Sequence, residues 1–160
     1  MNAAEKIQFL VFALDERPFG IRLSQSQRVI RAVDCTPLPQ APSIVLGVIN
    51  LHGQIVPVFN IRKRFGFPER DIRLDDHFII ARTTTIRTMA LLVDSVTGVV
   101  EQDADTIVAI TKVLPAAEQI EGVVALGEGI MLIHDLDRFL SAEERQTLEH
   151  ALTEQPGHGS

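Results

Sequence analysis

An internal repeat constrains the fold of this chain more than any other feature of its sequence. Residues 47–61 (GVINLHGQIVPVFNI) align without a gap with residues 122–136 (GVVALGEGIMLIHDL), at an offset of 75. Four aligned pairs are identical: Gly47/Gly122, Val48/Val123, Leu51/Leu126 and Ile55/Ile130. Residues 20–30 and 90–100 give a second, weaker match at an offset of 70. Two matches in the same order predict a duplicated β unit of roughly 65–75 residues.

Short apolar runs bounded by turn residues predict strands along most of the chain. We expect strands at 9–14, 19–23, 45–51, 54–61, 78–83, 88–93, 95–100, 107–111, 123–126 and 130–134. Because proline cannot donate to a β ladder, Pro18 predicts that residues 15–18 form a hairpin loop. Residues 24–33 fit neither the helix period nor the strand period, and both structures stay open for them.

The C-terminal part of the chain carries a helix signal. Ser141 followed by Glu144 is a capping box, which predicts a helix over residues 142–153. Residues 62–65 are expected to form a single helical turn closed by Gly66. The tail, residues 154–160, is expected to be disordered.

A β unit this small covers its apolar residues only by curling into a barrel. We therefore expect a mainly β fold in which residues 1–160 form one domain with two lobes, at about 9–70 and 77–140. Since a small unit buries too little surface to be stable alone, the two lobes are expected to share an apolar seam.

Composition and charge exclude several classes of protein. The net charge of −6 argues against a nucleic-acid binder or an anionic-membrane binder, which need clustered Lys and Arg. Apolar runs such as residues 55–59 are too short to span a bilayer. A single cysteine, Cys35, and a start without a signal-peptide pattern fit a reducing compartment, so we expect a cytoplasmic location.

Side chains able to do chemistry are sparse. None of the five histidines stands in an HExxH motif or at metal-ligand spacing, and there is no GxSxG motif. Gly127 and Gly129 lie between two expected strands rather than before a helix, so they predict a turn and not a phosphate cradle. We therefore predict no catalytic residue, no metal and no cofactor, and expect the protein to act by binding.

The basic run Arg62-Lys63-Arg64 has two interpretations. In one, the run complements the dipole at the end of a short helical turn; in the other, it binds phosphate or an acidic partner. A separate alternative is a small-molecule-binding domain that uses the seam between the lobes, with Arg28, Asn50 and His52 as its candidate polar groups.

The order of these motifs resembles the CheW family, the coupling proteins of bacterial chemotaxis. The most specific stretch is Pro-x-x-Pro-x-x-x-x-Gly-Val-Ile-Asn-Leu-x-Gly-x-Ile-Val-Pro-Val at residues 39–58, and Leu-Val-Asp-x-Val at 92–96 supports it. The resemblance implies two SH3-like five-stranded β-barrels. It also implies a non-enzymatic adaptor that links the cytoplasmic tips of chemoreceptors to a CheA-type histidine kinase, or a coupler in a related pathway with a non-swimming output.

The resemblance also implies where partners bind. It places the receptor tip in a groove between the lobes, formed by Arg28, Val29, Gly47, Leu51, His52, Val93, Val96 and Val99. Candidates for the kinase contact are Ile55, Pro57 and Arg62. Arg28 and His52 stand where the family usually has an acid and a base, so an attraction between those two positions is lost in this chain.

Overall fold

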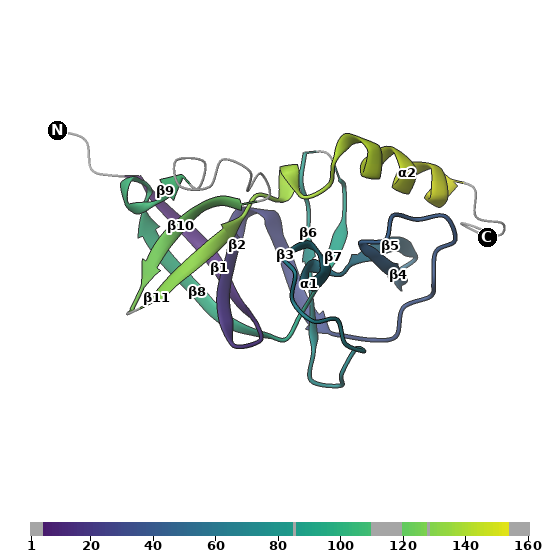
Figure 1. Ribbon diagram of the computed structural model, residues 1–160, viewed down its shortest axis with the longest axis horizontal. Coiled ribbons are helices and arrows are strands. Elements are labelled where there is room, and N and C mark those ends of the chain that lie inside the picture. The colour runs from purple at the N-terminus through teal and green to yellow at the C-terminus, as the bar shows by residue number, and fades with distance from the viewer. Residues whose placement is uncertain (1–4, 85, 110–119, 128, 154–160) are drawn as a thin grey trace.

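The computed structural model describes residues 5–84, 86–109, 120–127 and 129–153 (Figure 1). Its strands are β1 Lys6–Leu14, β2 Arg17–Arg22, β3 Ser26–Arg31, β4 Val45–Leu51, β5 Gln54–Phe59, β6 His77–Ala81, β7 Met89–Val93, β8 Ser95–Asp103, β9 Val108–Ala109, β10 Ile120–Leu126 and β11 Gly129–His134. The α-helices are α1 Ile61–Arg64 and α2 Ala142–Thr153, and short 3-10 turns cover Leu23–Gln25, Ala104–Thr106 and Leu136–Arg138. The predicted mainly β fold with a C-terminal helix is confirmed.

The strands form two sheets that lie next to each other along the long axis of the molecule (Figure 1). The first sheet has the order β8-β1-β2-β11-β10-β9, and the second has the order β3-β6-β7-β5-β4. Because β9 is only two residues long, each sheet has five main strands. Closure of the sheets into SH3-like barrels stays a prediction.

The predicted lobe boundaries, 9–70 and 77–140, do not match these sheets. The hairpin β1–β2 joins strands from residues 95–134, and the hairpin β6–β7 joins strands from residues 26–59. The two copies of the repeat have therefore exchanged their first hairpins. The repeat shows which strands are equivalent. Because the two equivalent hairpins present the same strand edges, the sequence does not show whether a hairpin pairs with strands of its own copy or of the other copy.

Strand register confirms the duplication. In the second sheet β5 runs parallel to β7, with Val58 opposite Ala90. In the first sheet β11 runs parallel to β2, with Ile133 opposite Gly20. Val58 and Ile133 are 75 residues apart, and Gly20 and Ala90 are 70 apart, which are the two offsets of the sequence repeat. The two sequence matches therefore mark the two strands of this parallel pair, and the pair forms with the same register in each sheet.

The identical pair Gly47 and Gly122 has the same function in each copy. A Cβ atom at Gly47 would lie 2.4 Å from the carbonyl oxygen of Thr36, and one at Gly122 would lie 2.8 Å from that of Val108. Another backbone segment therefore passes too close to either position for a side chain to fit. This close approach explains why both copies have glycine here.

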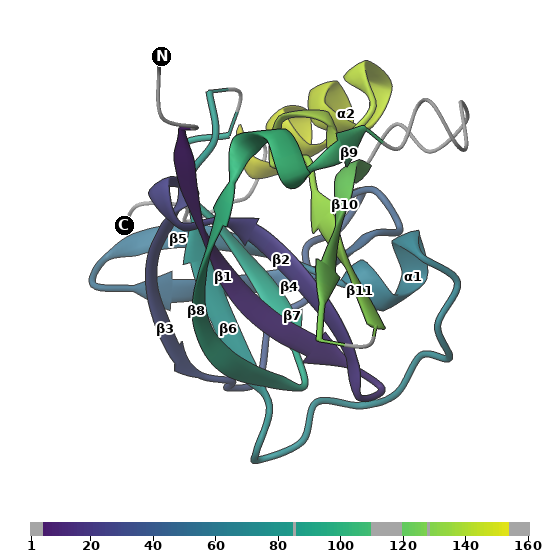
Figure 2. The same ribbon diagram turned by 90° about the vertical axis from the view of Figure 1, so that its left-hand side faces the viewer.

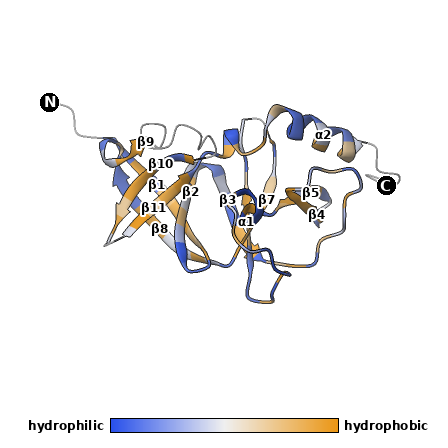
Figure 3. Cartoon of the chain, in the orientation of Figure 1, coloured by the Kyte–Doolittle hydropathy of each residue, from blue (hydrophilic) through white to orange (hydrophobic). Residues whose placement is uncertain are grey.

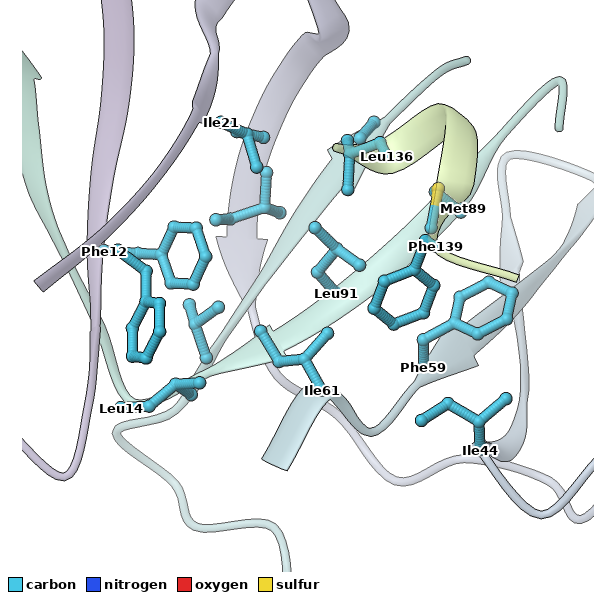
Figure 4. Close-up of a cluster of buried hydrophobic side chains, with 14 of the residues drawn as sticks. Phe12, Leu14, Ile21, Ile44, Phe59, Ile61, Met89, Leu91, Leu136 and Phe139 are labelled. Atoms are coloured by element: carbon cyan, nitrogen blue, oxygen red, sulfur yellow. The ribbon is translucent and has the colours of Figure 1, made fainter. Parts of the chain in front are cut away.

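The seam between the sheets holds the largest apolar core, which we call the central cluster (Figure 4). The first sheet contributes Phe12, Leu14 and Ile21, and the second contributes Phe59 and Leu91 among others. Each sheet has a further small core on its other face. The predicted apolar seam is confirmed.

Strands that bury both faces serve two cores at once. In β7, Met89, Leu91 and Val93 belong to the central cluster, while Ala90 and Leu92 belong to the core of the second sheet. Side chains alternate across a strand, so a strand between two cores is apolar at every position. In Figure 3 most strands are largely hydrophobic in colour, whereas α2 has mixed colours.

The first hairpin differs from its prediction. Its turn is only two residues long, Asp15 and Glu16, and both have positive φ, at 49° and 67°. Pro18 lies inside β2, opposite Ala13. Leu14 and Arg17 form the hydrogen-bonded pair that closes the turn. In an antiparallel ladder the next pair, Ala13 and Pro18, exchanges no hydrogen bonds, so the missing N–H of the proline removes no hydrogen bond to β1.

Helix α2 begins as predicted. The Ser141 hydroxyl accepts a hydrogen bond from the Glu144 N–H at 3.0 Å, and a Glu144 carboxylate oxygen accepts one from the Ser141 N–H at 3.0 Å. Glu144 also pairs with Arg64 at 2.8 Å, which ties the helix to α1. The tail, residues 154–160, and the last two residues of the strand expected at 107–111 lie outside the described residues.

Candidate functional site

The predicted receptor groove contains two edge strands, β3 of the second sheet and β8 of the first. Among the described strands β3 pairs only with β6, and β8 pairs only with β1. In Figure 2, which looks along the long axis, both strands lie on the same side of the molecule. Residues 24–33 had no clear period because β3 is such an edge, with one neighbour and mostly exposed side chains.

Each edge strand exposes a valine. Val29 on β3 is 37% exposed and Val99 on β8 is 50% exposed, which is unusual for large apolar side chains in this protein. The two residues are 70 apart in the sequence, so they occupy equivalent places in the two copies of the repeat. We call them the edge valines. Exposed apolar side chains on unpaired strand edges are typical of a surface that binds another protein.

Several other predicted groove residues are less exposed than the edge valines. Val93 is completely buried in the central cluster, so its prediction as a contact residue is wrong. Gly47 is buried beneath Thr36, Val96 packs against the central cluster, and Leu51 packs against the core of the second sheet. In strands that lie between two cores, the side chains are used for packing. The family resemblance does not distinguish residues that pack in this way from residues that bind a partner.

Arg28 and His52 are exposed but are not brought together by hydrogen bonding. Arg28 lies on β3 and His52 lies in the β4–β5 turn, and β3 and β4 are the opposite edges of the second sheet. In the part of the chain that the structure describes, no hydrogen bond or ion pair joins them. His52 has φ of 52°, and the Asn50 side-chain oxygen accepts a hydrogen bond from the Gly53 N–H at 2.8 Å. Asn50 therefore stabilises the turn.

The three kinase-contact candidates are largely covered. Pro57 is buried, and Arg62 is 4% exposed. Ile55 is half-buried in a hollow that it shares with Leu148 and Leu152 of α2. Direct contact through Pro57 and Arg62 is thus contradicted, because both residues are buried, and the Arg62 side chain belongs to an internal ion network.

Arg62 is the centre of that ion network. Its guanidinium donates to Asp15 at 2.7 Å and to Asp94 at 2.6 Å. Arg70 donates to Asp94 at 2.6 Å and to Asp76 at 2.8 Å. The network joins α1 and the segment after it to the β1–β2 and β7–β8 turns. Of the two interpretations of the basic run, neither describes Arg62, whose charge is used inside the protein.

Hydrogen bonds in the network shift the pKa of two carboxyls. The hydrogen bond from Arg62 lowers the pKa of Asp15 below its usual value. Burial opposes ionisation of Asp76, but bonds from Arg70 and from the Arg73 N–H together hold the pKa of this carboxyl below its usual value. Both carboxylates are therefore ionised at neutral pH, as the pairing requires.

The described residues contain no group of three or more His, Cys, Asp and Glu side chains placed to hold a metal ion. No helix in the same residues is long and apolar enough to cross a membrane.

Comparison with known proteins supplies the family. A family model described as a CheW-like domain matches residues 8–144, most of the chain. This chain belongs to the CheW-like family. It is 26% identical to the chemotaxis protein CheW of Treponema pallidum over 149 residues, covering 90% of this chain and 88% of the relative. It is 28% identical to that of Klebsiella aerogenes over 146 residues, covering 89% and 87%.

A solved CheW-like structure has the same fold. The scaffolding protein TtCheW from Thermoanaerobacter tengcongensis superposes with a TM-score of 0.78 at 27% identity, covering 88% of this chain and 96% of that one. This CheW-like chain is therefore related to chemotaxis proteins and to a scaffold, which agrees with a binding function and with the prediction of a non-enzyme.

One surface was missed by the sequence prediction. A hollow of about 300 Å³ lies on the first sheet, with Arg17, Phe65, Phe67, Ile130 and Leu132 in its lining. The sequence did contain a signal, because Ile130 is identical to Ile55 in the repeat. Only the structure shows that one of these isoleucines is covered and the other is open.

Proposed function

We propose that this CheW-like chain is an adaptor that couples the cytoplasmic tip of a chemoreceptor to a CheA-type histidine kinase. The observation that carries the proposal is the pair of edge valines, exposed at equivalent places on two edge strands. A receptor tip that covers both would bury apolar surface and bring the two copies of the repeat into one interface.

Charge at the same edge is expected to select the partner. Arg28 is exposed next to Val29, where the family usually has an acid. Complementary charge contributes more to partner choice than to affinity. We therefore propose that the cognate receptor tip has a carboxylate opposite Arg28, and that receptors with a base there bind poorly.

The alternative of a small-molecule site in the seam is disfavoured. The seam is filled by the apolar side chains of the central cluster, whose members are buried. Arg28, Asn50 and His52, the polar candidates for such a site, are all exposed and do not belong to that cluster. A ligand pocket needs polar groups that converge in a cavity, and these three do not provide them.

Val29→Asp and Val99→Asp are each expected to weaken binding to a receptor fragment at least about tenfold. Burial of a valine contributes about 1.5 kcal/mol, and a buried carboxylate adds a desolvation cost. The measurement is co-sedimentation of the purified variants with the receptor fragment and the kinase of the same organism.

The matched control for these variants is Leu74→Asp. Leu74 is 91% exposed and lies in the segment between α1 and β6, outside both edge strands. Its substitution should leave binding unchanged, and all three variants should keep the circular dichroism of the parent. If Val29→Asp and Val99→Asp bound as tightly as the parent, the edge valines would not be the receptor contact.

A further inference from the structure

Two hollows of similar size occupy equivalent places in the two sheets. The open hollow, about 300 Å³, lies beside the parallel pair β2–β11, and Ile130 and Leu132 are in its lining. The covered hollow, about 310 Å³, lies beside the parallel pair β7–β5, and Ile55 and Pro57 are in its lining. Both hollows lie where a hairpin of one copy of the repeat pairs with the last strand of the other copy, β2 with β11 and β7 with β5.

The repeat relates the two linings residue by residue. Ile55 and Ile130 are 75 residues apart, as are Pro57 and Leu132. A basic residue stands at the rim of each hollow, Arg17 in one and Arg87 in the other, 70 residues apart. The two hollows therefore share an isoleucine and a basic residue at equivalent positions, and both have further apolar residues in their linings.

This chain's own helix α2 forms one side of the covered hollow. Leu148 and Leu152, four residues apart and hence on one face of the helix, line it together with Glu149. Arg87 lines the same hollow, so the helix brings a carboxylate to a hollow that also has a basic residue in its lining. An amphipathic helix with two leucines and an adjacent acid thus fits this kind of surface.

No described helix of the chain covers the open hollow. After β5 the chain forms only the four-residue α1, and Phe65 and Phe67 then line one side of the hollow. Ile130 is 61% exposed, whereas its equivalent, Ile55, is half-buried. Arg17 lies over the ring of Phe67, with 6.0 Å between the guanidinium carbon and the ring centroid.

The open hollow is separate from the edge that carries the proposed receptor contact. It lies on β2 and β11, which are interior strands of the first sheet, while β8 is at the edge of that sheet on the other side of β1. The inference therefore does not rest on the proposed function.

We propose that the open hollow is the docking site for an amphipathic, acidic α-helix of a partner protein. The helix places two large apolar side chains, four residues apart, against Phe65, Phe67 and Ile130. It directs a carboxylate toward Arg17, since α2 likewise brings Glu149 to the hollow that Arg87 lines. Helix-in-groove binding of this kind is a common mode of peptide recognition.

The test uses the helix that the chain itself provides as a model. A fluorescent peptide with the sequence of residues 142–153, held helical by a hydrocarbon staple on the face opposite Leu148 and Leu152, is titrated with the full chain. We expect saturable binding with a Kd on the order of 100 μM, from partial burial of two leucines and one charge pair. Amide chemical shifts should change at residues 17–19, 65–67 and 130–132.

Two variants locate the binding site. Ile130→Lys should weaken peptide binding at least about tenfold, because it puts a charge on the apolar floor. Arg17→Glu should also weaken it, and a peptide in which Glu149 is replaced by Lys should restore binding to this variant. Leu74→Lys, at an exposed position remote from the hollow, is the control and should bind like the parent.

Three outcomes would overturn the proposal. The first is no binding at peptide concentrations up to about 1 mM. The second is binding that Ile130→Lys leaves unchanged. The third is chemical-shift change confined to residues 54–57 and 86–88, which would mean that the peptide only displaces α2 from the covered hollow.

Discussion

Replacement of Asp94 with alanine is expected to lower the free energy of unfolding by about 3–5 kcal/mol. The Asp94 carboxylate accepts hydrogen bonds from Arg62 at 2.6 Å and Arg70 at 2.6 Å, and from the Asp15 N–H at 2.7 Å. Arg62 is almost completely buried, so loss of Asp94 leaves a cation inside the protein with Asp15 as its remaining carboxylate partner. Urea unfolding followed by circular dichroism measures the change.

The control for this variant is Asp103→Ala. Asp103 pairs with Lys6 at 3.3 Å on the surface, where both side chains are largely solvated, and its loss should cost at most about 1 kcal/mol. An effect of Asp94→Ala as small as that of the control would show that the network does not hold the two turns in place.

The network also predicts a dependence of stability on acid pH. The pKa values of Asp15 and Asp76 are lowered by their hydrogen bonds in the folded chain. A carboxyl with a lowered pKa stabilises the folded state above its unfolded pKa of about 4, and this contribution is lost as the pH falls below that value. The network should therefore contribute fully at neutral pH.

Replacement of His134 with phenylalanine is expected to stabilise the protein and to remove most of its sensitivity to mild acid. His134 is completely buried, and its ring centroid lies 4.4 Å from that of Phe65 and 5.1 Å from that of Phe19. Neither of its ring nitrogens has a hydrogen-bond partner, a condition that costs about 1–3 kcal/mol for a buried group. The equivalent residue in the other copy is Phe59, so a phenylalanine is accommodated at this place in the fold.

The direction of the pH effect follows from the imidazole pKa. Burial lowers the pKa of His134 to about 3. The unfolded chain binds a proton at this residue near pH 6.5, whereas the folded chain does not, so stability falls as the pH drops below 6.5. Between pH 7.5 and pH 5 this loss amounts to about 2 kcal/mol in the parent chain, and it should be absent in His134→Phe.

Urea unfolding at pH 7.5 and pH 5 tests this prediction. His52→Asn is the control, because His52 is exposed in a turn with positive φ, where asparagine is well tolerated, and it should keep the pH dependence of the parent. Equal pH dependence in His134→Phe and the parent would contradict the prediction.

The candidate site was only partly predictable from the sequence. Val29 and Val99 were both predicted as contact residues and both are exposed on edge strands. Val93 and Arg62 were predicted from the same family resemblance, and both are buried. A family motif contains both residues that pack in the core and residues that bind partners. Whether a residue is exposed depends on which distant segments cover it, so exposure could not be derived from the motif.

The sequence by itself determined the local elements and the duplication. Apolar periodicity, the Ser141–Glu144 capping box and the offsets of 75 and 70 depend on residues close together or on direct comparison of two segments, and the structure confirms each of them. Only the tertiary structure decided how the copies combine. The exchange of hairpins, the ion network around Asp94 and the covering of one hollow but not its equivalent are contacts between distant segments, and equivalent strand edges do not specify their own partners.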